Sequence, residues 1–360
     1  RGLGDVYKRQ SMGANYPDVS WQKTTMKNIG LDFYLLSDRI SGSFDFFRND
    51  ITRLLGYAST SPLAIYETRP INGGHYYRRG WELMVDTKNL VGEFTWDTSL
   101  TFSKTNSFWK ERLPNYDYQI YQQRENEPMS AYYYYNVTGI INTDRSNMPE
   151  SQKTLQAEAQ LPGCPIIEDK NKDGKIDEND VYMKDNSPAI YVGIGNTFTY
   201  KRFEFSFFMY GQFGIQKYNI AYSAAQAGPL AVDYPENSNK FAYRLWNSQT
   251  NPNGSRPGLA IGKMGALPGN AWVNADRENA SFMRMRNITL AYNLAGNILG
   301  SLQRYVRNIK VYVDAQNPFI LTKFQGFDPE IYTGGGGASG GSRGEYPQTR
   351  TFSLGVNITF

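Results

Sequence analysis

Strict alternation of apolar and polar residues constrains the fold of this chain more than any other feature of its sequence. It is clearest in the C-terminal segment TRTFSLGVNITF. Every second residue there is apolar, and the series ends on an aromatic residue: Phe352, Leu354, Val356, Ile358 and Phe360. The other parity is polar or small: Thr351, Ser353, Gly355, Asn357 and Thr359. Successive side chains of a β-strand point to opposite faces of a sheet, so this segment is predicted to form a strand with one apolar face.

The same alternation recurs along the chain, mostly in pairs of segments joined by tight turns. Such pairs are 27–35 with 43–51, 81–85 with 94–102, and 192–200 with 203–209, and single segments follow at about 282–294, 307–316 and 348–360. Each pair predicts a β-hairpin. The sequence therefore predicts an all-β chain with nine strands in one wall.

The composition agrees with strands and excludes several function classes. Aromatic residues make up 15% of the chain and recur in short runs broken by turn-forming residues, which favours strands. The only cysteine is Cys164 and the only histidine is His75, so an internal disulfide, a histidine-based metal site and a Ser-His-Asp triad are excluded. A net charge of +4 without a basic block, zinc-finger spacing or phosphate loop argues against nucleic acid and nucleotides. We therefore do not expect an enzyme.

Short and long connections alternate when the tyrosine run at 132–135 is placed in a loop. The long ones cover residues 52–77, 106–188, 216–280 and 317–347. Structureless loops of this size are unusual in compact soluble domains, whereas outer-membrane barrels combine short periplasmic turns with long external loops. The expected fold is the C-terminal part of a large antiparallel transmembrane β-barrel, with the apolar face of each strand toward lipid.

Further strands are expected to precede this chain. A bacterial single-chain barrel usually has an even number of strands, whereas nine are counted here. The sequence shows no signal peptide and no apolar segment of about 20 residues that would predict a membrane helix. Residues 1–10, RGLGDVYKRQ, fit no strand pattern and are interpreted as an artefactual scar, which leaves 11–360 as the barrel part.

A second feature is the acidic segment DKNKDGKIDEND, residues 169–180, which has the spacing of a calcium loop. Candidate oxygen ligands at loop positions 1, 3, 5, 7, 9 and 12 are Asp169, Asn171, Asp173, the carbonyl of Lys175, Asp177 and Asp180. Gly174 stands at position 6, where such a loop turns sharply. We predict calcium as a structural cofactor, although Asp replaces the usual Glu at position 12. An Asx-rich turn without an ion is the alternative.

The long connections also carry aromatic residues that are candidates for contact with a substrate or partner. They are Trp109, Tyr132, Tyr133, Tyr134, Tyr135, Trp246 and Trp272. A platform for sugar rings is one interpretation, and packing within the loops is the other. Trp96 and Tyr200 are instead expected in the interfacial girdle of the wall, and the run at 334–341 is expected to be a flexible loop tip.

Six segments resemble, in order, the TonB-dependent outer-membrane transporters of the SusC and RagA type from Bacteroidetes. They are PDVSWQKTTMKNIGLDF, GWELMVDTKNLVGEFTWDTSLTFS, DKNKDGKIDEND with GNTFTYKRFEFSFFMYGQFG, SFMRMRNITLAYNL, NPFILTKFQGFDPE and YPQTRTFSLGVNITF. The resemblance implies a 22-stranded barrel in the outer membrane, with an internal plug, energy from TonB and a surface lipoprotein of the SusD type. Large plugged barrels of this kind are a known architecture. The plug and the TonB-contacting segment have no counterpart in this sequence.

The function implied by this resemblance is import of a nutrient too large for porins, with a glycan or oligosaccharide favoured as substrate. Two alternatives remain open from the residues. One is a secreted, calcium-dependent carbohydrate-binding β-sandwich, although its strands would be spaced more evenly. The other is a passive porin or a surface adhesin barrel, which would need neither plug nor TonB.

Overall fold

Two compact units make up the chain in a computed structural model. The structure describes residues 16–59, 68–114, 118–122, 126–219, 244–258, 267–275, 277–295, 299–301, 304–326, 328–330 and 348–360. The smaller unit comprises Arg1–Asn28, Phe47–Arg79 and Ser107–Met129, and the larger comprises Ile29–Phe46, Gly80–Asn106 and Ser130–Phe360. The predictions for residues 1–10 and 334–341 lie outside the described residues.

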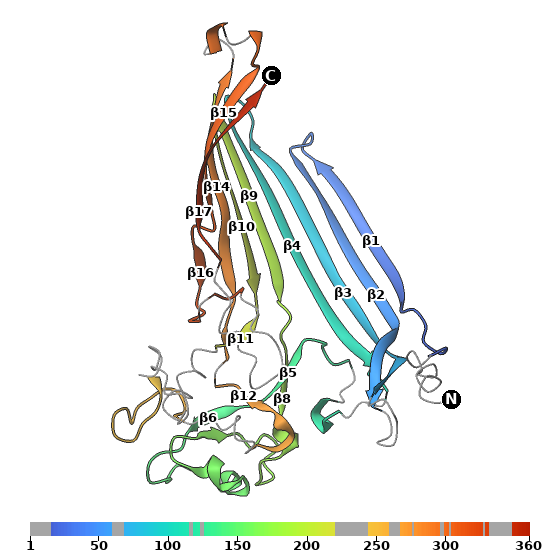
Figure 1. Ribbon diagram of the computed structural model, residues 1–360, viewed down its shortest axis with the longest axis vertical. Helices are drawn as coiled ribbons and strands as arrows, with labels where there is room; N and C mark the ends of the chain where they lie inside the picture. Colours follow the sequence, from blue (N-terminus) through green and yellow to red (C-terminus); the bar gives the residue numbers. More distant parts are fainter. Residues whose placement is uncertain are drawn as a thin grey trace, which may run out of the picture. The chain divides into compact units, whose positions relative to one another are not determined.

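Ten strands form the main sheet (Figure 1). They are β1 (Lys23–Leu35), β2 (Ile40–Ser59), β3 (Thr68–Leu90), β4 (Phe94–Glu111), β9 (Ile190–Tyr200), β10 (Phe203–Phe213), β14 (Phe282–Ala295), β15 (Asn308–Gln316), β16 (Ile320–Thr322) and β17 (Thr351–Thr359). The order is β1-β2-β3-β4-β9-β10-β14-β15-β17, with β16 beside β14. The nine predicted wall strands are therefore confirmed, and their order in the sheet follows the chain.

One face of this sheet carries an unbroken row of apolar residues across six strands of the larger unit. Directly paired residues form the row Trp96, Phe198, Phe205, Leu290, Val313 and Leu354. The row is open to the surroundings, with exposed fractions of 49% for Leu290, 53% for Val313 and 76% for Leu354. An apolar surface of this extent is unusual on a protein surrounded by water. The structure thus confirms the prediction that the apolar residues of these strands share one face of the sheet.

The opposite face carries a polar row at the neighbouring positions of the same strands. Its paired residues are Asp97, Thr197, Ser206, Thr289, Asp314 and Ser353. The hydroxyl of Thr289 donates to Asp314 over 2.7 Å, and Lys310 Nζ lies 2.9 Å from Glu204 Oε1. Polar side chains on this face thus satisfy one another across the strands.

The tenth strand, β16, was not predicted. β15 ends at Gln316, Asn317 takes a positive φ of 50°, and β16 then resumes pairing with β14 at Ile320. The sequence Asn317-Pro318 favours a turn, and Pro318 has no N–H for the ladder, so the pattern indicated a loop from residue 317. The backbone N–H of Asn317 donates to the carbonyl of Arg286 over 2.9 Å, which keeps the interrupted strand on the sheet.

The predicted loop at 52–77 was too long, because β2 extends to Ser59 and β3 begins at Thr68. Arg53 takes a positive φ of 58° within β2. The buried positions then change from Ile51 before it to Leu54 and Ala58 after it, so the side chains do not keep one alternation along the strand. Periodicity therefore gave no signal of a strand there.

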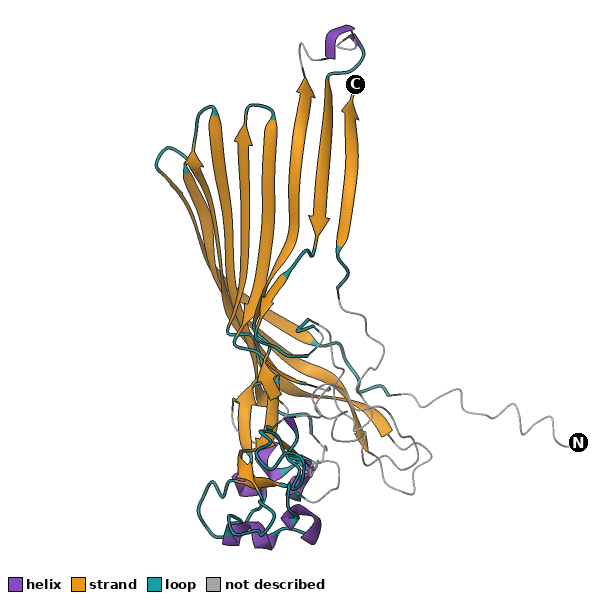
Figure 2. Cartoon of the chain, turned by 90° about the vertical axis from the view of Figure 1, so that its left-hand side faces the viewer, coloured by secondary structure: helices purple, strands orange, loops and turns teal. Residues whose placement is uncertain are grey.

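The long connections carry small sheets rather than structureless loops. A three-stranded sheet joins β12 (Trp272–Val273), β5 (Ala131–Tyr135) and β8 (Tyr182–Asp185); β6 (Val137–Ile140) pairs with β7 (Pro165–Ile167), and β11 (Gln216–Tyr218) pairs with β13 (Arg277–Asn279). The helices between them are short 3-10 turns, among them η2 (Glu150–Thr154), η3 (Ala157–Gln160) and η4 (Glu178–Asp180) (Figure 2). No described helix has the length and apolar character needed to cross a membrane. The tyrosine run forms β5, outside the main sheet as predicted.

The two faces generate a test on adjacent residues of β17. Val356→Arg places a charge on the apolar face and, near a bilayer midplane, should lower the free energy of unfolding by about 2–4 kcal/mol. Asn357→Arg, on the opposite face, is the matched control and should change it much less. Denaturant unfolding of the full-length protein in lipid vesicles measures both. Equal losses for the two variants would contradict the assignment of the faces.

Candidate functional site

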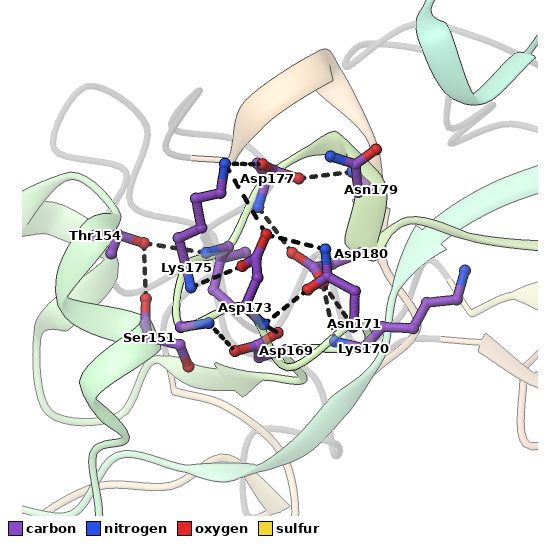
Figure 3. Close-up of polar contacts among 12 residues, drawn as sticks. Ser151, Thr154, Asp169, Lys170, Asn171, Asp173, Lys175, Asp177, Asn179 and Asp180 are labelled. Atoms are coloured by element: carbon purple, nitrogen blue, oxygen red, sulfur yellow. Dashed lines mark hydrogen bonds and ion pairs between the residues drawn. The ribbon is translucent and has the colours of Figure 1, made fainter.

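Residues 169–180 fold into a compact loop held together by its own carboxylates (Figure 3). The carboxylate of Asp169 accepts hydrogen bonds from the backbone N–H groups of Asp173 and Gly174, at 3.2 and 2.9 Å. Gly174 adopts a φ of 87°, the left-handed conformation predicted for the sharp turn at position 6. The first half of the loop therefore has the predicted turn.

Asp180 closes the loop from its other end. Its carboxylate is completely buried and accepts from the N–H of Lys170 at 2.9 Å and from the N–H of Asp177 at 2.8 Å. Asp177 in turn caps η4: its side chain accepts from the N–H of Asn179 at 2.8 Å, and it forms a reciprocal capping box with Asp180. Protein hydrogen bonds thus join the start of the loop to its end.

Lys175 lies beside two of the predicted metal ligands. Its Nζ is 2.9 Å from Asp177 Oδ2 and 4.0 Å from Asp173 Oδ2. The hydrogen bond from Lys175, followed by that from the Asn179 N–H, lowers the pKa of Asp177, and Asp177 raises the pKa of Lys175 in return. An ammonium group therefore neutralises part of the acidic cluster.

The donor set has the hard oxygen chemistry that calcium requires, but the geometry assigns several of these oxygens to other partners. Within the described residues, no three His, Cys, Asp or Glu side chains converge as a metal site would require. Bound calcium would have to displace Lys175 from Asp177, and Asp180 already accepts backbone donors. Calcium therefore stays a prediction.

Tyr135 connects this loop to a distant segment. Its side chain is fully buried, and its hydroxyl is 3.0 Å from the carbonyl of Asp177 and 3.1 Å from that of Pro268. Asn136, the next residue, donates to Glu168 over 2.6 Å just before the loop begins. For Tyr135 the structure therefore agrees with packing rather than with a ligand platform.

Tyr132 and Tyr134 belong to a ladder of rings on the other face of β5. The ring centres of Tyr132 and Tyr134 are 5.3 Å apart, and Tyr182 of β8 stacks on Tyr134 at 5.7 Å. Two cations cover the ends, with the Arg277 guanidinium 3.6 Å from the Tyr132 ring centre and Lys170 Nζ 4.6 Å from that of Tyr182. Such cation–π contacts stabilise the ladder, and the two cations lie over ring faces on which a sugar would otherwise stack.

Burial accounts for the altered acidity of this ladder. Desolvation raises the pKa of the Tyr132 hydroxyl and lowers the pKa of Arg277. The sequence analysis missed Tyr182, Arg277 and Lys170, which come from three separate segments. The segment AYYYY did carry one signal. If it forms a strand, successive side chains point to opposite faces, so Tyr132 and Tyr134 lie on one face and Tyr133 and Tyr135 on the other.

The three candidate tryptophans have different surroundings. Trp109 belongs to the smaller unit, where Tyr76 contacts its ring edge-on at 6.1 Å and the Arg112 guanidinium lies 5.1 Å from it. The backbone of Trp272 pairs with Tyr134, and its side chain is outside the described atoms. Trp246 is half-buried and lines a cavity of the larger unit. Of the predicted aromatic residues, Trp246 is therefore the best placed to meet a ligand.

Comparison with known proteins supports the family predicted from the sequence. No family model matches the chain. It is 27% identical over 368 residues to the TonB-dependent receptor SusC of Bacteroides thetaiotaomicron, covering 99% of this chain and 34% of that protein. It is 25% identical over 363 residues to the TonB-dependent receptor P3 of Formosa agariphila, covering 95% and 34%. The predicted resemblance to SusC-type TonB-dependent receptors is confirmed.

The fold agrees with a solved structure of the same type. A structure of the RagAB peptide transporter matches with a TM-score of 0.71 and 21% identity, over 96% of this chain and 36% of that one. The predicted all-β antiparallel fold is thereby confirmed. The predicted outer-membrane location is confirmed by the similarity to the TonB-dependent receptors SusC and P3. The chain spans about a third of the length of these relatives.

The hydrogen bonds of Asp180 generate a prediction that does not depend on an ion. Asp180→Ala leaves the backbone N–H groups of Lys170 and Asp177 without their acceptor, at a cost of up to about 1–3 kcal/mol for each group that water does not reach. In chelator, a protease should therefore cleave the interval between Pro165 and Pro188 faster in this variant of the full-length protein. Asn179→Ala, at an exposed position of the same loop, is the control and should be cut at the original rate. An unchanged rate in Asp180→Ala would show that the carboxylate does not close the loop.

The calcium prediction is tested by the same digestion without a substitution. Ordering of the loop by an ion at Asp169, Asn171, Asp173, Asp177 and Asp180 should slow cleavage in millimolar calcium relative to chelator, and Asp173→Ala should reduce the difference. Identical cleavage rates with calcium and with chelator would reject a structural ion.

Proposed function

We propose that the protein acts as a TonB-dependent importer of the outer membrane and takes up a glycan or oligosaccharide. Its partners would be the TonB complex and a surface lipoprotein of the SusD type. The paired apolar and polar rows from β4 to β17 carry this proposal. A lipid-facing barrel wall requires this arrangement, in which side chains alternate between hydrocarbon and a polar interior.

The similarity to SusC and P3 supports active import over the alternatives. A secreted β-sandwich would cover its apolar face with a second sheet, whereas Phe352 and Leu354 are 73% and 76% exposed. A passive porin or an adhesin would share the two-faced wall. Dependence on TonB therefore separates these functions.

The loop sheets support a role in substrate contact outside the wall. They hold aromatic and carboxamide side chains on short, cross-braced strands, which suits a binding surface better than unstructured loops would. The 169–180 loop would then act as a brace, because Tyr135 and Asn136 connect it to neighbouring segments. We assign no catalytic role to any of these residues.

Import is tested by gene deletion in the source bacterium, followed by complementation with the full-length gene. We expect the deletion to abolish growth on at least one neutral polysaccharide as sole carbon source. Complementation should restore growth, and loss of TonB should abolish it again. Growth that survives the loss of TonB would identify a passive pore, and a defect confined to peptide use would reject a glycan as substrate.

A further inference from the structure

A cavity of about 640 Å³ lies beside Trp246 within the larger unit. Its walls come from β6, from residues 252–257, and from Asn142, Asn147, Asn274 and Trp246. The volume is within the range of small-molecule sites, about 300–1,000 Å³. Three segments far apart in sequence thus build one concave surface.

The backbone fixes Trp246 before any ligand arrives. The N–H of Trp246 donates to the carbonyl of Arg256 over 2.8 Å, and the N–H of Gly258 donates to Gly163 over 3.0 Å. A Cβ on Gly163 would lie 2.8 Å from Trp246 Cε3, and one on Gly258 would clash with the Trp246 carbonyl oxygen. The chain therefore encloses one side of the indole closely. A preorganised aromatic side chain loses little conformational entropy on binding.

The lining is neutral and rich in hydrogen-bonding groups. Arg256 is the one charged side chain among the described lining residues, and its Nη2 is 3.2 Å from Glu278 Oε1. Asn253 and Ser255 are exposed. The buried Oδ1 of Asn142 has no hydrogen-bond donor among the described residues. An anionic ligand would find no cation without a carboxylate partner, and an aliphatic ligand would meet mostly polar atoms.

Two backbone groups of the strand that forms one wall are already bonded to side chains. Extended peptides commonly bind by pairing with a free strand edge. Here the Val137 N–H donates to Asn274 Oδ1 over 3.0 Å, and the Ile140 carbonyl accepts from Asn147 Nδ2 over 2.8 Å. Both carboxamides line the cavity, so side chains already occupy these backbone groups of β6. At these two positions the wall offers side-chain amides rather than free backbone groups.

The carboxamide of Asn274 is itself held in position. Its Nδ2 donates to Asn136 Oδ1 over 2.7 Å, and Asn136 Nδ2 donates to Glu168 over 2.6 Å. This chain of hydrogen bonds runs from the cavity to the residue before the 169–180 loop. The orientation of Asn274 is therefore fixed from behind, as a selective site requires.

From these observations we infer that the cavity beside Trp246 is a subsite for a neutral saccharide unit. One face of a sugar ring would pack on the indole, and its hydroxyls would bond with the carboxamides and Ser255. The inference deepens the proposed function and rests on it for the substrate class. It assigns the contact to this cavity and not to the tyrosine ladder.

The test measures binding by titration calorimetry to the full-length protein purified in detergent. The probes are maltoheptaose, laminariheptaose, xylohexaose and an uncharged capped penta-alanine peptide. We expect at least one neutral oligosaccharide to bind and the peptide not to bind. Trp246→Ala removes the stacking surface, and Ser255→Trp fills the cavity without removing the indole. Each should weaken saccharide binding at least tenfold.

Gln249→Ala is the matched control, because Gln249 is exposed on the same loop and does not line the cavity. It should leave binding within twofold, and heat-modifiable gel mobility confirms that every variant is folded. Saccharide binding unchanged in both Trp246→Ala and Ser255→Trp would overturn the inference, as would binding of the peptide alone. The binding assay needs neither TonB nor transport. It can therefore fail while the growth experiments support import, and it can succeed while the growth experiments reject import.

Discussion

The antiparallel register from β4 to β17 is the constraint on which the rest of the larger unit depends. Because the side-chain period of a strand is two, a slip of one residue would move an apolar side chain such as Leu290 or Val313 to the polar face. The register also satisfies the backbone N–H and C=O groups in the ladder, which a membrane interior requires. The same pairing therefore settles both the hydrogen bonding and which surface of the sheet is apolar.

This register is interrupted at two places within the main sheet. The pairing of β10 with β14 shifts between Phe208 and Met209, and β15 yields to β16 at Asn317. Near these irregularities, Arg284 of β14 is buried and forms ion pairs with Asp328 at 2.7 Å and with Glu330. A buried arginine is tolerated because carboxylates pair with it, so charge pairing replaces apolar packing at this end of the strand.

In the loop sheets, polar side chains hold segments together through hydrogen bonds, in addition to being potential ligand contacts. Asp180 bonds to backbone groups of its own loop, Tyr135 bonds to backbone groups of other segments, and Asn274 bonds to both Asn136 and Val137. A hydrogen bond to such a partner offsets the cost of desolvating a buried polar atom. These polar contacts add to the apolar packing of buried residues in the long connections, among them Ile141, Ile167 and Val181.

The sequence by itself determined the features that depend on neighbours along the chain. Alternation in TRTFSLGVNITF gave the faces of β17, the tight turns gave the hairpins, and the spacing of DKNKDGKIDEND located a turn at Gly174. Tertiary structure decided how segments distant in the chain combine. Pairing with β14 restored β16 beyond Asn317-Pro318, Arg277 and Tyr182 completed the ring ladder of Tyr134, and Trp246 met Asn274 across a cavity. Periodicity reports which face a side chain takes, but the partner on that face depends on loop paths that no local pattern encodes.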